Sequence, residues 1–170
     1  MSVKRLLVVV DMQHDFVDGA LGTPQARAIV PAVAQLLAKE RAAGSAVAFT
    51  LDTHTEEYLS TQEGRLLPVP HCIRGTRGWE LIPELNAADA RLFEKGTFGS
   101  TELASYARAY DEVVLCGVCT DICVVSNALL IKAFAPETRV LVAAEACAGT
   151  SPAAHEAALL TLKSCQTEIL

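Results

Sequence analysis

The chain has 170 residues, of which 51% are apolar and 20% are charged, a composition typical of a globular protein. A chain of this length can bury one substantial core but is short for two, so we expect a single domain over residues 1–170. The formal net charge of −6 argues against a nucleic-acid partner, because binding phosphates requires clustered lysine and arginine.

The amino-terminal segment and the cysteines indicate the compartment. Lys4 and Arg5 are followed by only five apolar residues, which is too short for a secretory signal or a membrane span, so we expect no membrane partner. The six cysteines lie mostly inside apolar runs and not at the loop spacing of a disulfide-rich secreted protein. We therefore expect reduced thiols in a cytoplasmic protein.

Hydrophobic patterning predicts an alternation of strands and helices without repeats or linkers. Aliphatic runs typical of buried strands occur at 5–11, 45–52, 90–95, 112–118 and 138–144. Helical spacing occurs at 26–44, 100–110, 121–134 and 151–165. The polar stretch from 53 to about 78 is interpreted as a long loop. The alternation predicts an α/β fold in which helices cover both faces of a parallel sheet.

Residues able to do chemistry follow four of these strands. Because right-handed crossovers bring the carboxyl ends of parallel strands to one edge of the sheet, residues there should lie close together. The residues at these strand ends are Asp11, Asp52, His54, Lys95, Cys119 and Cys123. Their convergence predicts a ligand site at that edge.

The segment CGVCTDICV, residues 116–124, contains three of the six cysteines. The strand should end near Val118, with Thr120 as the N-cap of the next helix, so that Cys123 falls in the first turn. Free N–H groups and the positive end of the helix dipole favour a thiolate there, and the thiolate is the nucleophilic form of cysteine. Cys123 is therefore the candidate nucleophile.

Other interpretations of this segment are a metal site of three cysteines, a redox pair of Cys116 with Cys119, and a thiol sensor without catalysis. Cys116 lies within the apolar strand, which favours a role as a small buried hydrophobic residue. Cys119 lies in the strand-to-helix turn, where a structural and a chemical role are both open. The sequence has no second cluster of Cys or His at zinc-finger spacing, which disfavours the cysteine metal site.

Asp11 and Lys95 could complete the chemistry of Cys123. Attack on an amide needs a base that takes the thiol proton and later protonates the leaving amine. Asp11 can act as this base if burial raises its pKa, and Lys95 can stabilise both anions. The N–H groups at the start of the helix, that of Cys123 in particular, offer an oxyanion hole. Alone, Asp11 would be interpreted as a cap and Lys95 as a solvated charge, but their shared sheet edge favours catalysis.

The segments LDTHTEEYLSTQEG and VPHC indicate a possible metal site. Asp52 and His54 are separated by one residue, so both side chains can turn to one ion from an extended segment. His71, with Glu63 as a further candidate, could return to the same ion from the long loop. Oxygen and imidazole ligands suit Zn²⁺, Mn²⁺ or Fe²⁺, and the alternative is that these are solvated loop residues.

Five segments occur in a fixed order along nearly the whole chain: VVVDMQHDFVDGAL, DTH, PHCIRGTRGWEL, EKGTFGS and GVCTDICV. They resemble the linked motifs of the isochorismatase-like cysteine hydrolase superfamily, most closely its nicotinamidase branch. Two positions depart from the nicotinamidase pattern. Pro68 stands where an aromatic residue is common, and Glu63 lies eight residues before His71, which is farther than in members with an acidic ligand.

The resemblance implies a catalytic role for three residues and a structural role for one turn. Asp11, Lys95 and Cys123 correspond to a triad in which the cysteine forms a thioester that water hydrolyses. The turn at Val118–Cys119 resembles the family's cis peptide beside the oxyanion hole, to which Cys119 would contribute an N–H.

The resemblance also implies how a cofactor and a substrate are held. Asp52, His54 and His71 correspond to metal ligands, and in nicotinamidases the pyridine nitrogen of the substrate sits on that metal. Phe16 and Phe98 correspond to aromatic residues that flank the ring. The implied cofactor is a divalent metal, Zn²⁺ first, with Mn²⁺ or Fe²⁺ as alternatives.

The implied fold is a three-layer α/β/α arrangement around a mainly parallel sheet of about six strands, isochorismatase-like and Rossmann-like. The implied function is cysteine-dependent hydrolysis of nicotinamide to nicotinate and ammonia, a reaction of NAD metabolism. Alternatives are hydrolysis of another small amide or ureido compound on the same triad, and a thiol sensor with this fold. Isochorismatase-type enol-ether hydrolysis is disfavoured, because members with that activity generally lack the cysteine. The expected partner is a small amide substrate, and the family is compatible with a homo-oligomer.

Overall fold

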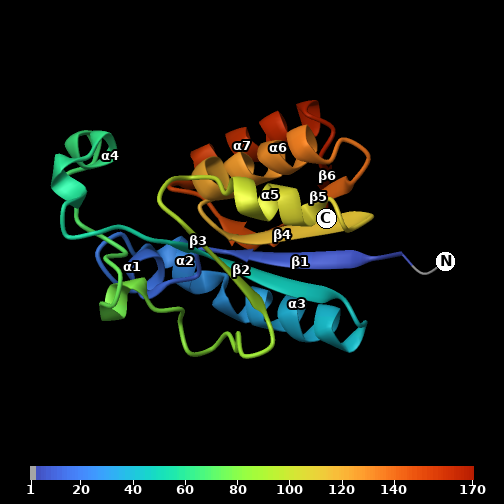
Figure 1. The fold of residues 1–170 in the computed structure, drawn as a ribbon, viewed down its shortest axis with the longest axis horizontal. Coiled ribbons are helices and arrows are strands. Elements are labelled where there is room, and N and C mark those ends of the chain that lie inside the picture. The colour runs from blue at the N-terminus through green and yellow to red at the C-terminus, as the bar shows by residue number, and fades with distance from the viewer. Residues whose placement is uncertain (1–2) are drawn as a thin grey trace.

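The computed structural model describes residues 3–170; the first two residues of the amino-terminal segment discussed above lie outside the described residues. A six-stranded, all-parallel sheet in the order β3-β2-β1-β4-β5-β6 forms the middle of the molecule (Figure 1). The α/β prediction, with a parallel sheet of about six strands, is confirmed. The strands are β1 Arg5–Val10, β2 Ala46–Asp52, β3 Arg91–Lys95, β4 Glu112–Val118, β5 Arg139–Ala148 and β6 Glu168–Ile169.

Helices cover both faces of the sheet, giving three layers. Helix α3 lies on one face, and α5, α6 and α7 lie on the other (Figure 1). The helices are α1 His14–Val17, α2 Pro24–Ala28, α3 Val30–Ala42, α4 Gln62–Leu66, α5 Thr101–Ala107, α6 Val125–Phe134 and α7 Pro152–Ser164. Three tighter or wider turns are η1 Tyr58–Ser60, η2 Arg77–Trp79 and the π-type η3 Thr120–Val124.

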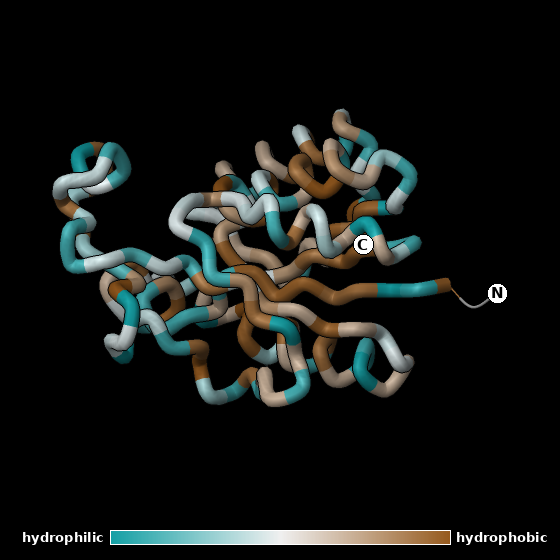
Figure 2. Tube along the Cα trace, in the orientation of Figure 1, coloured by the Kyte–Doolittle hydropathy of each residue, from teal (hydrophilic) through white to brown (hydrophobic). Residues whose placement is uncertain are grey.

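The core is built on β1, whose apolar residues 6–10 are fully buried. An unbroken aliphatic run is the pattern of a strand covered on both faces, because neither face can present polar side chains. Figure 2 shows this apolar centre, with more hydrophilic residues along the outer segments. In the part of the chain that the structure describes, no helix combines the length and apolar composition needed to cross a bilayer.

The strand order reverses between β1 and β4, from which chain connections run to opposite sides. In open parallel sheets a crevice forms at the carboxyl ends of the strands at such a point. Asp11 follows β1 and the segment of Cys123 follows β4, so the crevice receives both residues.

Two expected segments differ in detail. The helix expected at 26–44 is divided into α2 and α3, which meet at Ile29. Pro31 lies at the start of α3, where its missing N–H costs nothing, and it could not continue a helix from α2. The expected loop from 53 to 78 contains η1, α4 and part of η2, and the side chain of Thr61 caps α4.

Candidate functional site

The carboxylate of Asp11 is held at the end of β1 by the neighbouring strand. Asp11 is fully buried, and its backbone has a φ of 49°. Thr50 on β2 donates its hydroxyl to Asp11 Oδ1 at 2.6 Å. The second oxygen, Oδ2, lies 2.6 Å from Lys95 Nζ. This carboxylate is therefore fixed on both sides within the crevice.

Lys95, the last residue of β3, connects the acidic groups to the cysteine. Besides Asp11, its ammonium contacts Asp52 Oδ1 at 3.4 Å and Cys123 Sγ at 3.5 Å. It also donates to the carbonyl of Thr97 at 3.1 Å. The lysine is 5% exposed, so its charge acts at short range on all three side chains.

Cys123 is brought to this point by a close approach of β4 to β1. Gly117 has a φ of 109°, and a Cβ there would lie 2.2 Å from the carbonyl oxygen of Val10. The next peptide but one, Val118–Cys119, is cis, as the resemblance implied. The chain then enters η3, within which Cys123 is 6% exposed.

The expectation that Thr120 caps the helix is wrong. The cap position is Cys119, which makes no side-chain cap bond, and the first turn is of π type. The hydroxyl of Thr120 instead pairs with Nδ1 of His155 on α7 at 2.8 Å. His155 thus anchors the turn that carries Cys123 to the neighbouring helix.

The surroundings of Cys123 shift its pKa in the direction opposite to the one expected for a resting thiolate. Burial raises the pKa of Cys123 well above its ordinary value, and the nearby Asp11 charge raises it further, while Lys95 acts in the opposite direction. Burial also raises the pKa of Asp11, and Lys95 partly offsets this. Burial would lower the pKa of Lys95, but the Asp11, Cys123 and Asp52 charges outweigh it and raise it. Burial therefore opposes the thiolate that the start of the helix was expected to favour, and it favours the neutral thiol instead.

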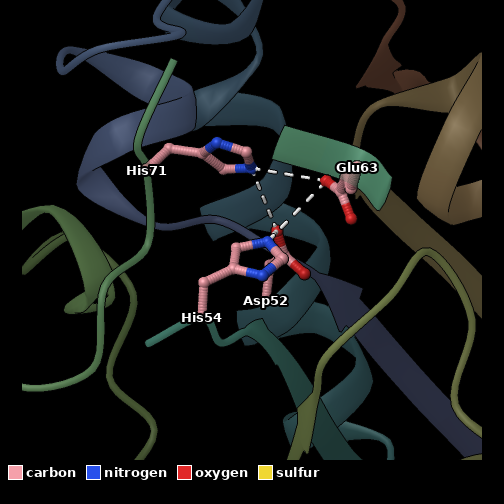
Figure 3. Close-up of side chains that lie close together, drawn as sticks. All are labelled: Asp52, His54, Glu63 and His71. Carbon is pink, nitrogen blue, oxygen red and sulfur yellow. Dashed lines mark hydrogen bonds and ion pairs between the residues drawn. The ribbon is translucent and has the colours of Figure 1, made fainter. Parts of the chain in front are cut away.

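Four side chains next to the triad could hold a metal ion (Figure 3). One ligand atom from each of Asp52, His54, Glu63 and His71 lies within 4.8 Å of the others. Asp52 Oδ2 is 3.0 Å from His54 Nε2 and 3.4 Å from His71 Nε2. Glu63 Oε1 lies 3.7 and 3.8 Å from the same two nitrogens. Two imidazoles with two carboxylates form a donor set that suits a divalent transition metal.

Neighbouring groups orient the two imidazoles. Nδ1 of His71 contacts the carbonyl of Val69 at 2.8 Å, which turns Nε2 toward the cluster. The buried ring of Tyr58 lies edge-on to both imidazoles, with centroid distances of 4.7 Å to His54 and 4.9 Å to His71. The residues present therefore fit a metal ion, with their outer contacts in place.

Two cavities adjoin these groups. One of about 290 Å³ is lined by Phe16, Leu21, Thr23, Asp52, Glu63, Leu67, His71, Phe98, Cys119, Ile122, Cys123 and Thr150. The expected ring-flanking residues Phe16 and Phe98 thus line the same cavity as Cys123. A second cavity, of about 500 Å³, includes His54 and shares Glu63, Leu67, Phe98 and Ile122 with the first.

Sequence reasoning missed several residues that hold the site in place. The amide of Gln13 donates to the carbonyl of Asp52 at 2.9 Å and accepts from its N–H at 2.8 Å. Asp15 accepts from the N–H of Cys72 at 2.7 Å and so fixes the backbone next to His71. The spacing of two between Asp11, Gln13 and Asp15 was the available signal, but it does not reveal the distant segments that these side chains contact.

The chain is similar to known proteins over nearly its whole length. The family model of the isochorismatase domain matches residues 5–170. The chain is 33% identical to the isochorismatase family protein PncA of Bacillus subtilis, over 92% of this chain and 93% of that one. It is 30% identical to the nicotinamidase/pyrazinamidase of Mycobacterium tuberculosis, over 98% of both chains.

A solved structure gives the same result. The pyrazinamidase of Pyrococcus horikoshii in complex with zinc superposes with a TM-score of 0.86 and 31% identity, covering 98% of each chain. Sequence similarity and the fold therefore both extend along nearly the full length of these proteins. The chain belongs to the isochorismatase family, on its nicotinamidase-like branch.

Proposed function

We propose that this protein is a nicotinamidase that hydrolyses nicotinamide to nicotinate and ammonia through a covalent thioester on Cys123. The observation that supports this most is the placement of the Lys95 ammonium 2.6 Å from Asp11 and 3.5 Å from the sulfur of Cys123, a residue that lines the cavity of about 290 Å³. The names of the relatives support an amide as the substrate. They also support an amide-cleaving hydrolase as the general class.

In the first half-reaction Asp11 acts as the general base. Its Oδ2 is buried and has only the Lys95 ion pair as a close polar contact within residues 3–170, so a lone pair is available for the thiol proton. As that proton moves to Asp11, the Cys123 sulfur forms a bond with the carboxamide carbon. Asp11 then gives the proton to the nitrogen, the C–N bond breaks, and ammonia leaves the thioester behind.

Backbone N–H groups stabilise the oxyanion of the tetrahedral intermediate. The candidates are those of Cys119, directly before the η3 turn, and Cys123, within it. The carbonyl of Cys119 accepts from Ile122 at 3.1 Å and from Val124 at 3.0 Å, while its own N–H donates to no acceptor in the described part of the chain. Fixed donors of this kind favour the charged intermediate over the neutral substrate, because they need no rearrangement during the reaction.

In the second half-reaction a water takes the position that ammonia left. Asp11 removes a proton from the water as its oxygen bonds to the thioester carbon. The C–S bond then breaks, and Asp11 returns the proton to the sulfur. Lys95 remains cationic throughout and stabilises the carboxylate whenever Asp11 is ionised.

Asp52, His54, His71 and Glu63 would hold a divalent metal, and Zn²⁺ is the ion that this ligand set suits best. When bound, the metal would supply a Lewis-acid contact for the pyridine nitrogen of the substrate. Phe16 and Phe98 would enclose the ring and so direct the carboxamide toward Cys123. Because a thiol nucleophile must stay reduced, we assign the protein to the cytoplasm. The proposed product, nicotinate, would place the reaction in NAD metabolism.

The decisive experiment measures ammonia release from nicotinamide by the purified protein. We expect turnover by the wild type and a loss of about 10⁴-fold or more in Cys123→Ala, because the covalent route is removed. Circular dichroism should show that the variant keeps its fold. Turnover of the variant at the wild-type rate would refute the thioester mechanism.

The second candidate is hydrolysis of a different small amide or ureido compound on the same triad. The observation in its favour is the additional cavity of about 500 Å³ beside the first one, which a single-ring amide would not fill. Ammonia release across a panel of small amides, each with and without chelator, separates the two candidates. A higher kcat/KM for another amide would replace nicotinamide as the substrate while leaving the triad in place.

A further inference from the structure

We propose that Asn127 is a positioning residue that fixes the spacing between the nucleophile turn and the Phe98 wall of the substrate cavity. Asn127 lies on α6, four residues after Cys123, and is fully buried. It acts through the backbone of two segments and not through contact with the substrate. The inference rests on the proposed function only for the identity of the substrate.

The side-chain amide of Asn127 contacts both segments at once. Its Nδ2 donates to the carbonyl of Cys123 at 2.8 Å and to the carbonyl of Phe98 at 3.3 Å. Its Oδ1 accepts from the N–H of Ser100 at 2.9 Å. A primary amide has two donor hydrogens and one acceptor oxygen on a rigid plane, so one side chain satisfies all three backbone groups.

The loop between β3 and α5, residues 96–100, is held at both ends, by Lys95 at one end and by α6 at the other. At one end the ammonium of Lys95 donates to the carbonyl of Thr97 at 3.1 Å. At the other end Gly99 lies close against α6, where a Cβ would be 2.5 Å from Leu130 Cδ1. Asn127 adds its two bonds at this second end. The loop therefore has little freedom to move away from α6.

Phe98 lies between these two attachments. Its side chain lines both cavities but is 45% exposed, so packing alone does not fix the ring. Its position depends on the backbone, whose carbonyl is held by Asn127. The same amide holds the carbonyl of Cys123. One side chain therefore links the backbone of the cysteine directly to the backbone of the ring.

The choice of residue at this position supports a specific role. Asparagine is a poor helix former, and a buried leucine would pack in α6 at lower conformational cost. The amide lies fully buried in the first turn of α6, VSNALLIKAF. Its bonds to the Phe98 carbonyl and the Ser100 N–H explain this, because these two loop groups have no other hydrogen-bond partner among residues 3–170.

The first test uses Asn127→Ser. A serine hydroxyl in a helix can donate to the carbonyl four residues earlier, which here is that of Cys123, but it is too short to reach Phe98 and Ser100 as well. We expect alkylation of Cys123 by iodoacetamide, followed by peptide mass spectrometry, to become about fivefold faster as the Phe98 wall loosens. We expect the KM for nicotinamide to rise about tenfold, with a smaller change in kcat.

The second test asks whether Asn127 acts through Phe98. Phe98→Leu alone should also speed alkylation and raise KM. In the double variant, Asn127→Ser should add less than half of its single effect, because the wall on which it acts is already altered. Additive effects in the double variant would overturn the proposal.

A matched control separates positioning from stability. Ile131→Val removes one methylene from the same helix four residues later, where the side chain is fully buried, and it leaves the loop contacts intact. It should lower the melting temperature without changing the alkylation rate or KM. Equal effects of both variants on alkylation, or none from Asn127→Ser, would refute the positioning role. If the wild type does not hydrolyse nicotinamide, the proposed function fails, and the alkylation cycle still decides the role of Asn127.

Discussion

Asp11, the general base of the proposed mechanism, has a pKa that is set by opposing contacts. Burial raises its pKa above the ordinary value of 3.8, while the Lys95 charge and the hydroxyl of Thr50 lower it. A carboxyl group that must accept a proton works only when it is ionised. The acid side of the pH profile should therefore report the balance between burial and these two partners.

The first prediction is the sign of this dependence. Below the Asp11 pKa the carboxyl group is protonated and cannot accept the thiol proton, so kcat/KM should rise with pH through a midpoint above 3.8. Because the pKa of the Cys123 thiol is raised, the thiol does not ionise near neutral pH, and we expect no loss of activity there from its titration. The profile is measured with nicotinamide over the range in which metal content stays constant. A midpoint at or below the ordinary aspartate value would contradict the role of burial.

The second prediction concerns Thr50→Val. The Thr50 hydroxyl donates to Asp11 Oδ1 at 2.6 Å and so stabilises the ionised form. Without this bond the ionised form is less favoured, and the acid midpoint of kcat/KM should move to higher pH. Thr76→Val, in an exposed turn away from the triad, serves as the control and should leave the midpoint unchanged. A shift toward lower pH in Thr50→Val would show that another group controls the profile.

The third prediction concerns the metal ligands. The double variant Asp52→Ala, His54→Ala removes two adjacent donors and should contain no bound metal after purification, measured by elemental mass spectrometry. Glu63→Gln should weaken metal binding by about tenfold or more, since even the loss of an outer contact has an effect of that size. Glu57→Gln, in the same segment but outside the ligand group, should bind metal like the wild type. Metal retained by the double variant would disprove the ligand assignment.

At the scale of elements, the close approach of β4 to its neighbour β1 brings Cys123 toward Asp11. Gly117 permits this approach, since its φ of 109° is unfavourable for other residues and its α-hydrogen faces the Val10 carbonyl. Gly44 ends α3 with a φ of 80°, but nothing lies within 4 Å of the position of its Cβ. The two glycines therefore share a backbone requirement and differ in a steric one.

The fourth prediction uses this pair. Gly44→Ala should lower the free energy of unfolding by about 1 kcal/mol, the backbone cost alone. Gly117→Ala should cost about 3 kcal/mol or more, because the methyl group also collides with Val10. It should reduce turnover as well, since β4 must move away from Asp11. Urea unfolding and ammonia release measure both effects, and equal stability losses would contradict the close approach.

The sequence predicted the long elements and missed several of the shortest ones. Strands β1, β2 and β4 were predicted within two residues, because buried parallel strands are unbroken aliphatic runs. Strand β6 was not located, since two residues carry no periodicity. Helix α4 was also missed, because five residues with a single buried member show no apolar stripe. Such elements depend on tertiary contacts more than on local pattern.

The candidate site was predicted to a similar degree. Strand ends identified Asp11, Lys95 and Cys123 as neighbours, because parallel topology alone brings them together. Glu63 stayed an open candidate, since the return path of a loop cannot be read from its length. Asn127 was not recognised, because its partners Phe98 and Ser100 are distant in sequence. The effect of burial on the pKa of Cys123 was not anticipated, because the depth of burial is a property of the folded molecule.

At the scale of the whole molecule, the candidate site lies at one end of the sheet and a network of ion pairs lies at the other. Opposite the site, Arg5 at the start of β1 donates to both oxygens of Glu40, at 3.1 Å each, and to Glu112 at 2.6 Å. Arg139 and Glu168 extend this group across β5 and β6. The network joins α3 to four strands, far from Cys123 along the strand direction.

The fifth prediction is that this network affects stability but not catalysis. Arg5→Met leaves the carboxylates of Glu40 and Glu112 buried without their shared partner, and we expect a loss of about 2 kcal/mol in the free energy of unfolding, reduced from a fully buried pair by the partial exposure of Arg5. Arg74→Met, which removes an exposed pair with Glu94, should cost much less. Turnover at 25 °C should be unchanged in both. A large loss of turnover in Arg5→Met would mean that the two ends are coupled.

The parallel topology also determines what a fragment of this chain could do. Asp11 and Cys123 follow the adjacent central strands β1 and β4, yet β2, β3 and their connections intervene between them along the chain. Proteolysis at any intervening bond, followed by separation of the pieces, would divide base from nucleophile. Neither separated fragment should therefore hydrolyse substrate. Activity that survives cleavage would show that the two fragments remain associated.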